Sequence, residues 1–216
     1  MDADYALVIS PVLSGPYPPE LSGSAEGDIG IEHEFSVVTT DPDGSDVYYY
    51  IDWDDGTYTE WTGPHPSGVD VTVKHTYLEQ GDHSIKAKAK NTYGTESAWS
   101  LPLLFTVNAP ELEITLIKGG LFYATVNIKN NGKIAATDVS WSLEIQGDII
   151  LLGKKTTGIV PVILAGEVVT VQSNLILGLA EPQFLATAEE SFGSTDVVQR
   201  GGKIFFIFIK VNVGGG

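Results

Sequence analysis

Strict alternation of apolar and polar residues, interrupted by tight turns, is the feature that most constrains this sequence. In a β-strand successive side chains point to opposite faces of the sheet, so alternation with a period of two indicates a strand with one buried face. Nearly every segment alternates in this way, and almost none has the 3.6-residue period of a helix. In the first half the runs are Phe35–Val37, Val47–Trp53, Val69–Val73, Ile85–Ala89 and Leu103–Val107. The pattern therefore predicts an all-β fold.

Residue pairs that break regular structure separate these runs. Glycine, proline and aspartate favour the backbone angles of tight turns. Such pairs are Pro18-Pro19, Asp55-Gly56, Gly63-Pro64, Gly81-Asp82 and Tyr93-Gly94. Gly56–Gly68 is expected to be the longest loop of this half. Short strands at regular spacing, joined by such turns, are typical of a β-sandwich.

The second half also consists of alternating segments separated by turns, but its sequence does not repeat that of the first half. Its expected strands are Leu112–Leu116, Leu121–Lys129, Val139–Ile145, Asp148–Leu152, Gly158–Val160, Glu167–Ser173, Phe184–Ala188 and Lys203–Val213. Seven or eight strands is the number of an immunoglobulin-like domain. Asn108-Ala109-Pro110 forms a natural linker. We therefore predict two tandem immunoglobulin-like β-sandwich domains, residues 1–108 and 109–216.

Charge differs between the two halves. Residues 1–109 contain 18 acidic and four basic residues, whereas residues 110–216 contain ten acidic and eight basic residues. The net charge of −16 argues against nucleic acid as a partner, because binding phosphates requires lysine and arginine. The same charge disfavours an anionic membrane surface and favours the attraction of cations.

Cysteine is absent from the sequence, which excludes disulfides, thiolate metal sites and cysteine nucleophiles. Met1–Ile9 lacks the basic start and the apolar length of a signal peptide. The longest strongly apolar run is Ile204–Ile209, far shorter than a membrane-spanning helix. No membrane span is expected.

Several motifs of residues 41–94 occur in the order and spacing of one known family. They are Asp41-Pro42-Asp43-Gly44, Tyr50-Ile51-Asp52-Trp53-Asp54-Asp55-Gly56-Thr57, His75-Thr76-Tyr77, Gly81, Ile85, Asn91 and Gly94. This pattern resembles the PKD (polycystic kidney disease) domain over roughly residues 12–108. It departs from the family at Asp54, where glycine is usual, and at His83, where an aromatic residue is usual. Residues 110–213 loosely resemble the immunoglobulin-like domains of large archaeal and bacterial surface proteins.

The resemblance implies an extracellular, non-catalytic β-sandwich. PKD domains serve as spacers, adhesion modules and accessory domains of secreted hydrolases, so the resemblance implies a partner on the cell surface. The expected function is a structural or adhesion module of a cell-surface protein. Two alternatives are a self-assembling filament or surface-layer subunit, and a carbohydrate-binding accessory module. No catalytic residue is assigned.

Clustered aspartates form a candidate calcium site. Asp41, Asp43, Asp54 and Asp55 lie in two turn sequences on either side of one expected strand. Loop carboxylates are the oxygen ligands that Ca²⁺ prefers. The alternative is that each aspartate accepts hydrogen bonds from the backbone of its own turn. The strand would hold the two turns roughly 20 Å apart, which favours the alternative unless other segments bring them together.

Aromatic residues in the segment 56–68 form a candidate sugar platform. Tyr58, Trp61 and His65 could stack on a sugar ring, and long loops often carry function. The alternative is that Trp61 packs back over the edge of the sandwich, against Trp99.

Two apolar segments form a candidate assembly surface. Ile204–Ile209 is apolar on both faces, with Phe206 and Phe208 prominent, and Tyr5, Leu7 and Ile9 form a second apolar segment. An exposed apolar strand can pair with the sheet edge of another copy of the chain. The alternative is that the last strand is covered within its own protein.

Overall fold

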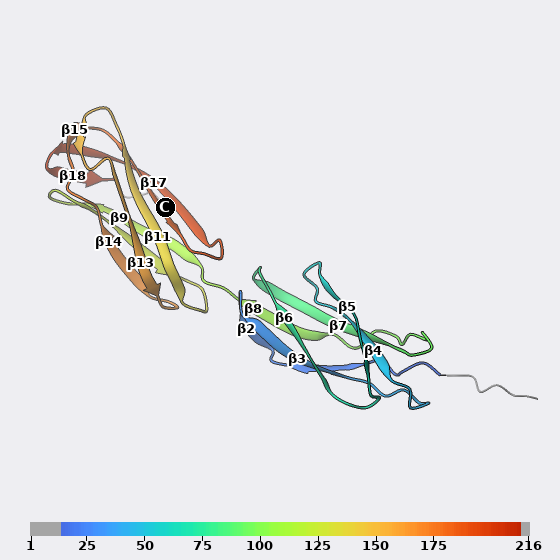
Figure 1. Ribbon diagram of the computed structural model, residues 1–216. Helices are drawn as coiled ribbons and strands as arrows, with labels where there is room; N and C mark the ends of the chain where they lie inside the picture. The colour runs from blue at the N-terminus through green and yellow to red at the C-terminus, as the bar shows by residue number, and fades with distance from the viewer. Residues whose placement is uncertain (1–13, 213–216) are drawn as a thin grey trace, which may run out of the picture. The chain divides into compact units, whose positions relative to one another are not determined.

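The computed structural model describes residues 14–212 and is all-β. The chain forms two compact units, Met1–Val107 and Asn108–Gly216, which we call domain 1 and domain 2. Figure 1 shows that each unit is built from strands packed in layers. The fold class is therefore that of immunoglobulin-like β-sandwiches, as the alternation predicts. Within residues 14–212 no helix is long and apolar enough to cross a membrane.

Domain 1 consists of two antiparallel sheets. The three-stranded sheet has the order β1-β3-β6, and the five-stranded sheet has the order β2-β8-β7-β4-β5. The first sheet comprises β1 (Glu20–Gly23), β3 (Glu32–Val38) and β6 (Val71–Thr76). The second comprises β2 (Glu26–Asp28), β4 (Val47–Asp52), β5 (Tyr58–His65), β7 (Gly81–Asn91) and β8 (Leu103–Asn108).

The inner faces of the two sheets form the core of domain 1. Alternate residues of β4 and β7 are fully buried, which confirms the period-two pattern of both strands. Between the sheets the rings of Phe35, Phe105 and Tyr77 pack together, with centroids 5.2 Å apart for Phe35–Phe105 and 5.4 Å for Tyr77–Phe105. Buried aromatic rings contribute a large apolar area and fix the distance between the layers.

The segment 56–68 differs from its sequence prediction. Most of it is the strand β5, which pairs only with β4 and is therefore an edge strand. Its pairing with β4 shifts register twice, and it contains Gly63-Pro64. Proline lacks a backbone N–H and is tolerated at a sheet edge. Gly63-Pro64, which predicts a turn, is therefore compatible with an edge strand.

Domain 2 consists of a small and a large sheet. The small sheet has the order β14-β10-β9, and the large one has the order β12-β15-β17-β16-β11-β13, with β18 pairing β17. The small sheet comprises β9 (Leu112–Gly119), β10 (Ala124–Asn130) and β14 (Val168–Gln172). The large sheet comprises β11 (Ala136–Gln146), β12 (Ile150–Leu152), β13 (Lys155–Ile163), β15 (Leu177–Ala180), β16 (Gln183–Glu189), β17 (Thr195–Phe206) and β18 (Phe208–Val211).

The described part of domain 2 has ten strands, more than the seven or eight expected. One cause is the segment Lys203–Val213, which the alternation predicts to be a single strand. It contains a hairpin instead, because β17 ends at Phe206 and β18 begins at Phe208. No glycine, proline, asparagine or aspartate marks this turn, so the sequence gives no turn signal there.

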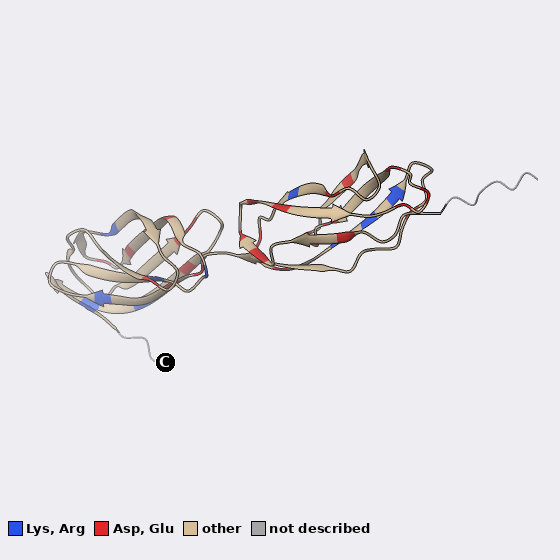
Figure 2. Cartoon of the chain, turned by 90° about the horizontal axis from the view of Figure 1, so that it is seen from below, with Lys and Arg blue, Asp and Glu red and all other residues tan. Residues whose placement is uncertain are grey.

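The acidic residues of domain 1 are spread over its strands and loops (Figure 2). Among the four basic residues of its half, Lys86, Lys88 and Lys90 all lie on the outer face of β7. They stand opposite Asp52, Tyr50 and Tyr48 of β4. The basic charge of domain 1 is therefore concentrated on one face of the five-stranded sheet.

Burial predicts a contrast between two phenylalanines of domain 2. Phe184 is completely buried and Phe192 is 46% exposed. We expect Phe184→Ala to lower the free energy of unfolding of domain 2 by about 3–5 kcal/mol, because it leaves a cavity. Phe192→Ala should change it by less than about 0.5 kcal/mol. Urea unfolding followed by circular dichroism measures both, and equal losses would contradict the assigned core.

Candidate functional site

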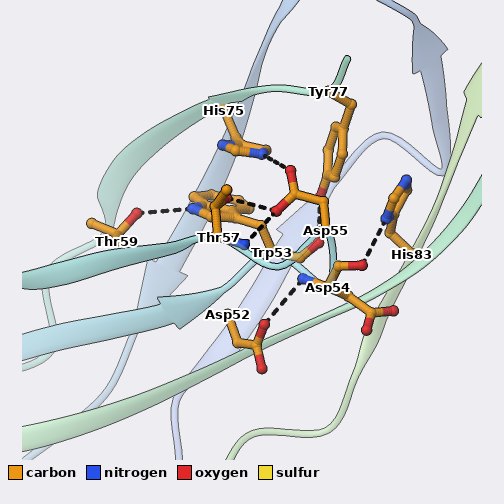
Figure 3. A network of polar contacts seen from close by, with 9 residues as sticks. All are labelled: Asp52, Trp53, Asp54, Asp55, Thr57, Thr59, His75, Tyr77 and His83. Carbon is orange, nitrogen blue, oxygen red and sulfur yellow. Dashed lines mark hydrogen bonds and ion pairs between the residues drawn. The ribbon is translucent and has the colours of Figure 1, made fainter. Parts of the chain in front are cut away.

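The turn that joins β4 to β5 is held by its own aspartates (Figure 3). Asp52 Oδ1 accepts the backbone N–H of Asp54 at 3.1 Å. Asp55 Oδ1 accepts both the backbone N–H of Thr57 at 2.9 Å and its hydroxyl at 2.6 Å. Such bonds to the backbone two residues on are the reason that aspartate favours turns. Asp54 itself has a φ of 62°, in the left-handed region that glycine adopts most easily.

A histidine and two aromatic rings pack against this turn (Figure 3). His75 Nε2 lies 2.7 Å from the second carboxylate oxygen of Asp55. The His75 ring stacks on Trp53 with centroids 4.5 Å apart and planes 5° apart. The Tyr77 hydroxyl donates to the backbone carbonyl of Trp53 at 3.1 Å. The strand β6 and the segment after it thereby clamp the turn of the opposite sheet.

The environment shifts two pKa values at this turn. Partial burial raises the pKa of Asp55, but hydrogen bonds from Thr57 and His75 outweigh it, and the net pKa lies below its ordinary value. Burial, together with the negative charges of Asp55, Asp54 and Asp52, raises the pKa of the Tyr77 phenol. Tyr77 is therefore a neutral hydrogen-bond donor at physiological pH, and Asp55 is ionised.

His83 and Asp54 connect the turn to β7. His83 Nδ1 lies 3.1 Å from the Asp54 carbonyl oxygen, and the backbone N–H of Ser84 donates to Asp54 Oδ2 at 2.8 Å. The His83 ring lies 4.3 Å from that of Tyr77 and is buried, as an aromatic residue would be. Its Nε2 has no hydrogen-bond partner among residues 14–212.

Both oxygens of Asp55 are engaged within the turn network, one by Thr57 and one by His75. Through these bonds the carboxylate holds the backbone of Thr57 and the ring of His75 in place. The network therefore has the chemistry of a structural clamp.

A second cluster lies on the outer face of the five-stranded sheet. We call it the aromatic face, and its aromatic members surround Tyr50. The Tyr50 ring lies 5.4 Å from Tyr58, 5.6 Å from Trp61 and 6.0 Å from Trp99. Tyr58 is 57% exposed and Trp99 is 44% exposed. The face consists of Tyr48, Tyr50, Tyr58, Trp61, Lys88, Lys90 and Trp99.

Lysines of β7 interleave with these rings. Lys88 Nζ lies 5.5 Å from the ring centroids of both Trp61 and Trp99, and Lys90 Nζ lies 4.4 Å from that of Trp61. Lys88 also forms an ion pair with Glu96 at 2.6 Å. Cation–π contacts of this kind hold aromatic rings in fixed orientations at a surface. The arrangement is an ordered, partly exposed aromatic surface rather than a pocket.

Comparison with known proteins identifies the family of domain 1. The family described as PKD domain matches residues 22–101. The PKD domain of an M14-like peptidase from Thermoplasmatales archaeon SCGC AB-540-F20 is 39% identical, and the match covers 44% of this chain and 97% of that chain with a TM-score of 0.42. The chain belongs to the PKD domain family.

Two further comparisons add no function. Red sea bream transglutaminase is 14% identical with a TM-score of 0.31, over 84% of this chain and 30% of that chain. Among curated proteins no match was found. PKD domains are typically extracellular, non-catalytic modules.

The structure gives physical content to the PKD motifs. Trp53, Asp55, His75 and Tyr77, which carry the resemblance, are the residues of the clamp (Figure 3). Asp54, at the position where the family usually has glycine, has the positive φ that makes glycine favourable there. Its carboxylate bond to Ser84 offsets part of that backbone cost.

The four aspartates of the candidate calcium site are divided between the two ends of β4. Asp54 and Asp55 belong to the turn after it, while Asp41 and Asp43 belong to the loop before it. Asp41 is 2% exposed, and its carboxylate accepts from the backbone of Asp43 and Ser45 and from Asn91. Within residues 14–212 no group of three or more His, Cys, Asp or Glu residues is placed to hold a metal ion. Calcium binding therefore stays a prediction.

The residues of the candidate sugar platform lie on two faces. Tyr58 and Trp61 pack around Tyr50 on the aromatic face, whereas the ring of His65 lies 5.9 Å from buried Tyr49 on the inner side. Sequence reasoning missed Tyr48, Tyr50, Lys88 and Lys90 as members of the cluster. Their position on the polar side of the alternation was visible, but the pairing of β4 with β7 was not.

The candidate assembly residues divide as well. Tyr5, Leu7 and Ile9 lie outside the described residues. Phe206 and Phe208 are 58% and 63% exposed, at a hairpin turn. The hairpin is also bonded to the segment before β10, because the Ile209 N–H donates to the Gly120 carbonyl and the Phe122 N–H donates to the Ile207 carbonyl. Strand donation at this hairpin stays a prediction.

The clamp predicts a pH-dependent stability. Because the Asp55 pKa is lower in the folded than in the unfolded chain, its stabilisation is complete above the ordinary carboxyl pKa near 3.8 and is lost as the pH falls below it. We expect Asp55→Ala to lower the free energy of unfolding by about 1–2 kcal/mol at pH 7, and by less near pH 3. Urea unfolding at several pH values measures this. Asp46→Ala, at an exposed loop aspartate, is the control, and a loss independent of pH would contradict a stabilising role of the Asp55 carboxylate.

Calcium is tested by melting the chain with Ca²⁺ and with a chelator. A ligand that binds only the folded state raises its stability, so calcium binding predicts a higher midpoint with Ca²⁺. Asp43→Asn and Asp54→Asn then report which end of β4 binds. An unchanged midpoint in the parent chain argues against the metal.

Proposed function

We propose that the chain is a non-catalytic, extracellular module with a structural or adhesive role in a cell-surface protein. The PKD family supports this proposal, since its members are typically extracellular modules. The fold supports it too, because both domains are sandwiches whose interiors are filled by side chains. Its partner would be another surface component, either protein or carbohydrate.

The aromatic face is the contact surface of this module. The observation that carries the assignment is the gathering of Tyr58, Trp61 and Trp99 around Tyr50 on the outside of a sheet. Tryptophan and tyrosine offer large contact areas at low cost in side-chain entropy and dominate the energetics of many interfaces. Here the sheet below them and the lysines between them hold the rings in place.

A carbohydrate ligand is the more specific candidate. The C–H face of a sugar ring is apolar and packs against an exposed aromatic ring. Tyr58 and Trp61 supply such rings, and Lys88 and Glu96 lie beside them as hydrogen-bonding groups. His65 has no part in this site, because it lies on the inner side of the sheet.

An array of neutral and acidic oligosaccharides tests the carbohydrate candidate. We expect the chain to bind a subset of sugars and Trp61→Ala to weaken that binding roughly tenfold, because a buried aromatic contact is lost. Tyr93→Ala, at a residue 64% exposed outside the aromatic face, is the matched control. If no oligosaccharide binds, or if Trp61→Ala leaves binding unchanged, the carbohydrate candidate is excluded and a protein partner is favoured.

A further inference from the structure

One end of domain 2 carries a row of exposed apolar side chains on adjacent segments. Phe205 of β17 stands between Leu179 of β15 and Phe208 of β18 in the register of the sheet. The row extends on both sides, since Leu121 bridges Phe208 and the backbone N–H of Leu179 donates to the Ile149 carbonyl at 2.8 Å. We call these five residues, Ile149, Leu179, Phe205, Phe208 and Leu121, the apolar row.

The apolar row is a continuous surface. Residues opposite one another on neighbouring strands point to the same face of a sheet, and neighbouring strands lie about 4.8 Å apart, so the row spans about 20 Å. Its members are between 47% and 63% exposed. Single exposed apolar residues are ordinary, but a contiguous patch marks an interaction site.

The residues of the turn at the end of this surface are unfavourable for the stability of the fold. Phe206 and Ile207 form a two-residue turn between the paired residues Phe205 and Phe208. Phe206 has a φ of 53°, in the region where such turns normally have asparagine or glycine. Its side chain is 58% exposed and packs edge-on against Phe205, with centroids 5.1 Å apart.

Phe122 is a second strained aromatic residue at the same end, with a φ of 70°. It is hydrogen-bonded to the hairpin through Ile207. Bulky residues at positive φ are rare, and strain of this kind persists where function requires it.

Lysines lie directly behind the apolar row. Lys203 and Lys210 stand opposite each other on β17 and β18, two residues before Phe205 and two after Phe208. Like charges opposite one another destabilise a sheet. Lys203 forms an ion pair with Glu181 at 2.8 Å, while Lys210 has no ion-pair partner within residues 14–212. Lys210 is therefore available to an anionic group above the sheet, whereas Lys203 is neutralised by Glu181.

We propose that this end of domain 2 docks on a lipid bilayer that carries anionic headgroups. The apolar row and Phe206 enter the boundary between headgroups and acyl chains, and Lys210 binds a headgroup. Amphipathic surfaces of this composition bind membrane interfaces through apolar area and charge together. The charge of the whole chain opposes such binding, but domain 2 is nearly neutral and presents lysines at this end.

A second copy of the chain fits this surface less well. Lys203, Lys210 and Glu181 together leave one positive charge at this surface of each copy, so two apolar rows in contact would bring like charges together. A bilayer supplies both the apolar layer and the negative charge.

Co-sedimentation of the full chain with vesicles tests the proposal. We expect binding to vesicles of phosphatidylcholine with phosphatidylglycerol, and weaker binding to phosphatidylcholine alone. Phe206→Asn should reduce binding roughly tenfold, because the ring no longer enters the interface. The same substitution relieves the backbone strain, so the melting temperature of domain 2 should be unchanged or higher. A structural role for Phe206 predicts the opposite change in stability.

Two controls separate the contributions. Phe192→Asn, at a residue 46% exposed outside the apolar row, should leave binding within about twofold. Lys210→Gln should weaken binding to the anionic vesicles only, and high salt should do the same. The proposal is overturned if no vesicle binds the chain, or if Phe206→Asn leaves binding unchanged. It is also overturned if the chain dimerises without lipid and Phe206→Asn abolishes the dimer, since the row is then covered by a second copy.

Discussion

The register between β4 and β7 is the constraint on which the contact face of the PKD domain depends. Tyr49 and Ile51 are completely buried, and so are their partners Ala89 and Ala87. Because side chains alternate strictly, burying these residues forces Tyr50 and Lys88 outward. A slip of one residue would bring lysines into the core, at a cost far greater than any gain on the surface. The ordered aromatic face is therefore a consequence of what lies beneath it.

The same rule operates at the hairpin of domain 2. Ile204 and Ile209 are buried opposite one another, and this places Phe205 and Phe208 on the outside. The two candidate contact surfaces are thus both outer faces of sheets. In each, the burial of the inner residues determines which side chains point outward. They differ in chemistry, since one is aromatic and hydrogen-bonding and the other is apolar with lysines behind it.

Much of the fold could be predicted from alternation and turn residues alone. Both faces of β4 and β7 follow from the sequence, because each residue type agrees with its side of the sheet. The clamp residues Trp53, Asp55, His75 and Tyr77 all belong to the PKD motif, although the motif did not predict their contacts with one another. What the sequence could not give was pairing between distant strands. The position of Trp99 beside Tyr50, 49 residues away in the chain, depends on tertiary packing that no local pattern records.

The errors have specific physical causes. Glycine and proline in the segment 56–68 signalled a loop, but an edge strand with two shifts of register accommodates both. At Phe206 the opposite error arose, since a turn formed where no turn residue is present. Asp41 and Asp55 of the candidate calcium site accept hydrogen bonds from the local backbone, as the alternative interpretation expects, and calcium binding stays a prediction.

The irregular pairing of β5 affects whether copies of this domain can aggregate through their sheet edges. A straight sheet edge offers a row of free N–H and C=O groups on which another chain can form an intermolecular sheet, the first step of aggregation. β5 interrupts that row through two shifts of register and a proline that has no N–H to donate. Copies of the PKD domain crowded side by side would therefore resist forming an intermolecular sheet through this edge.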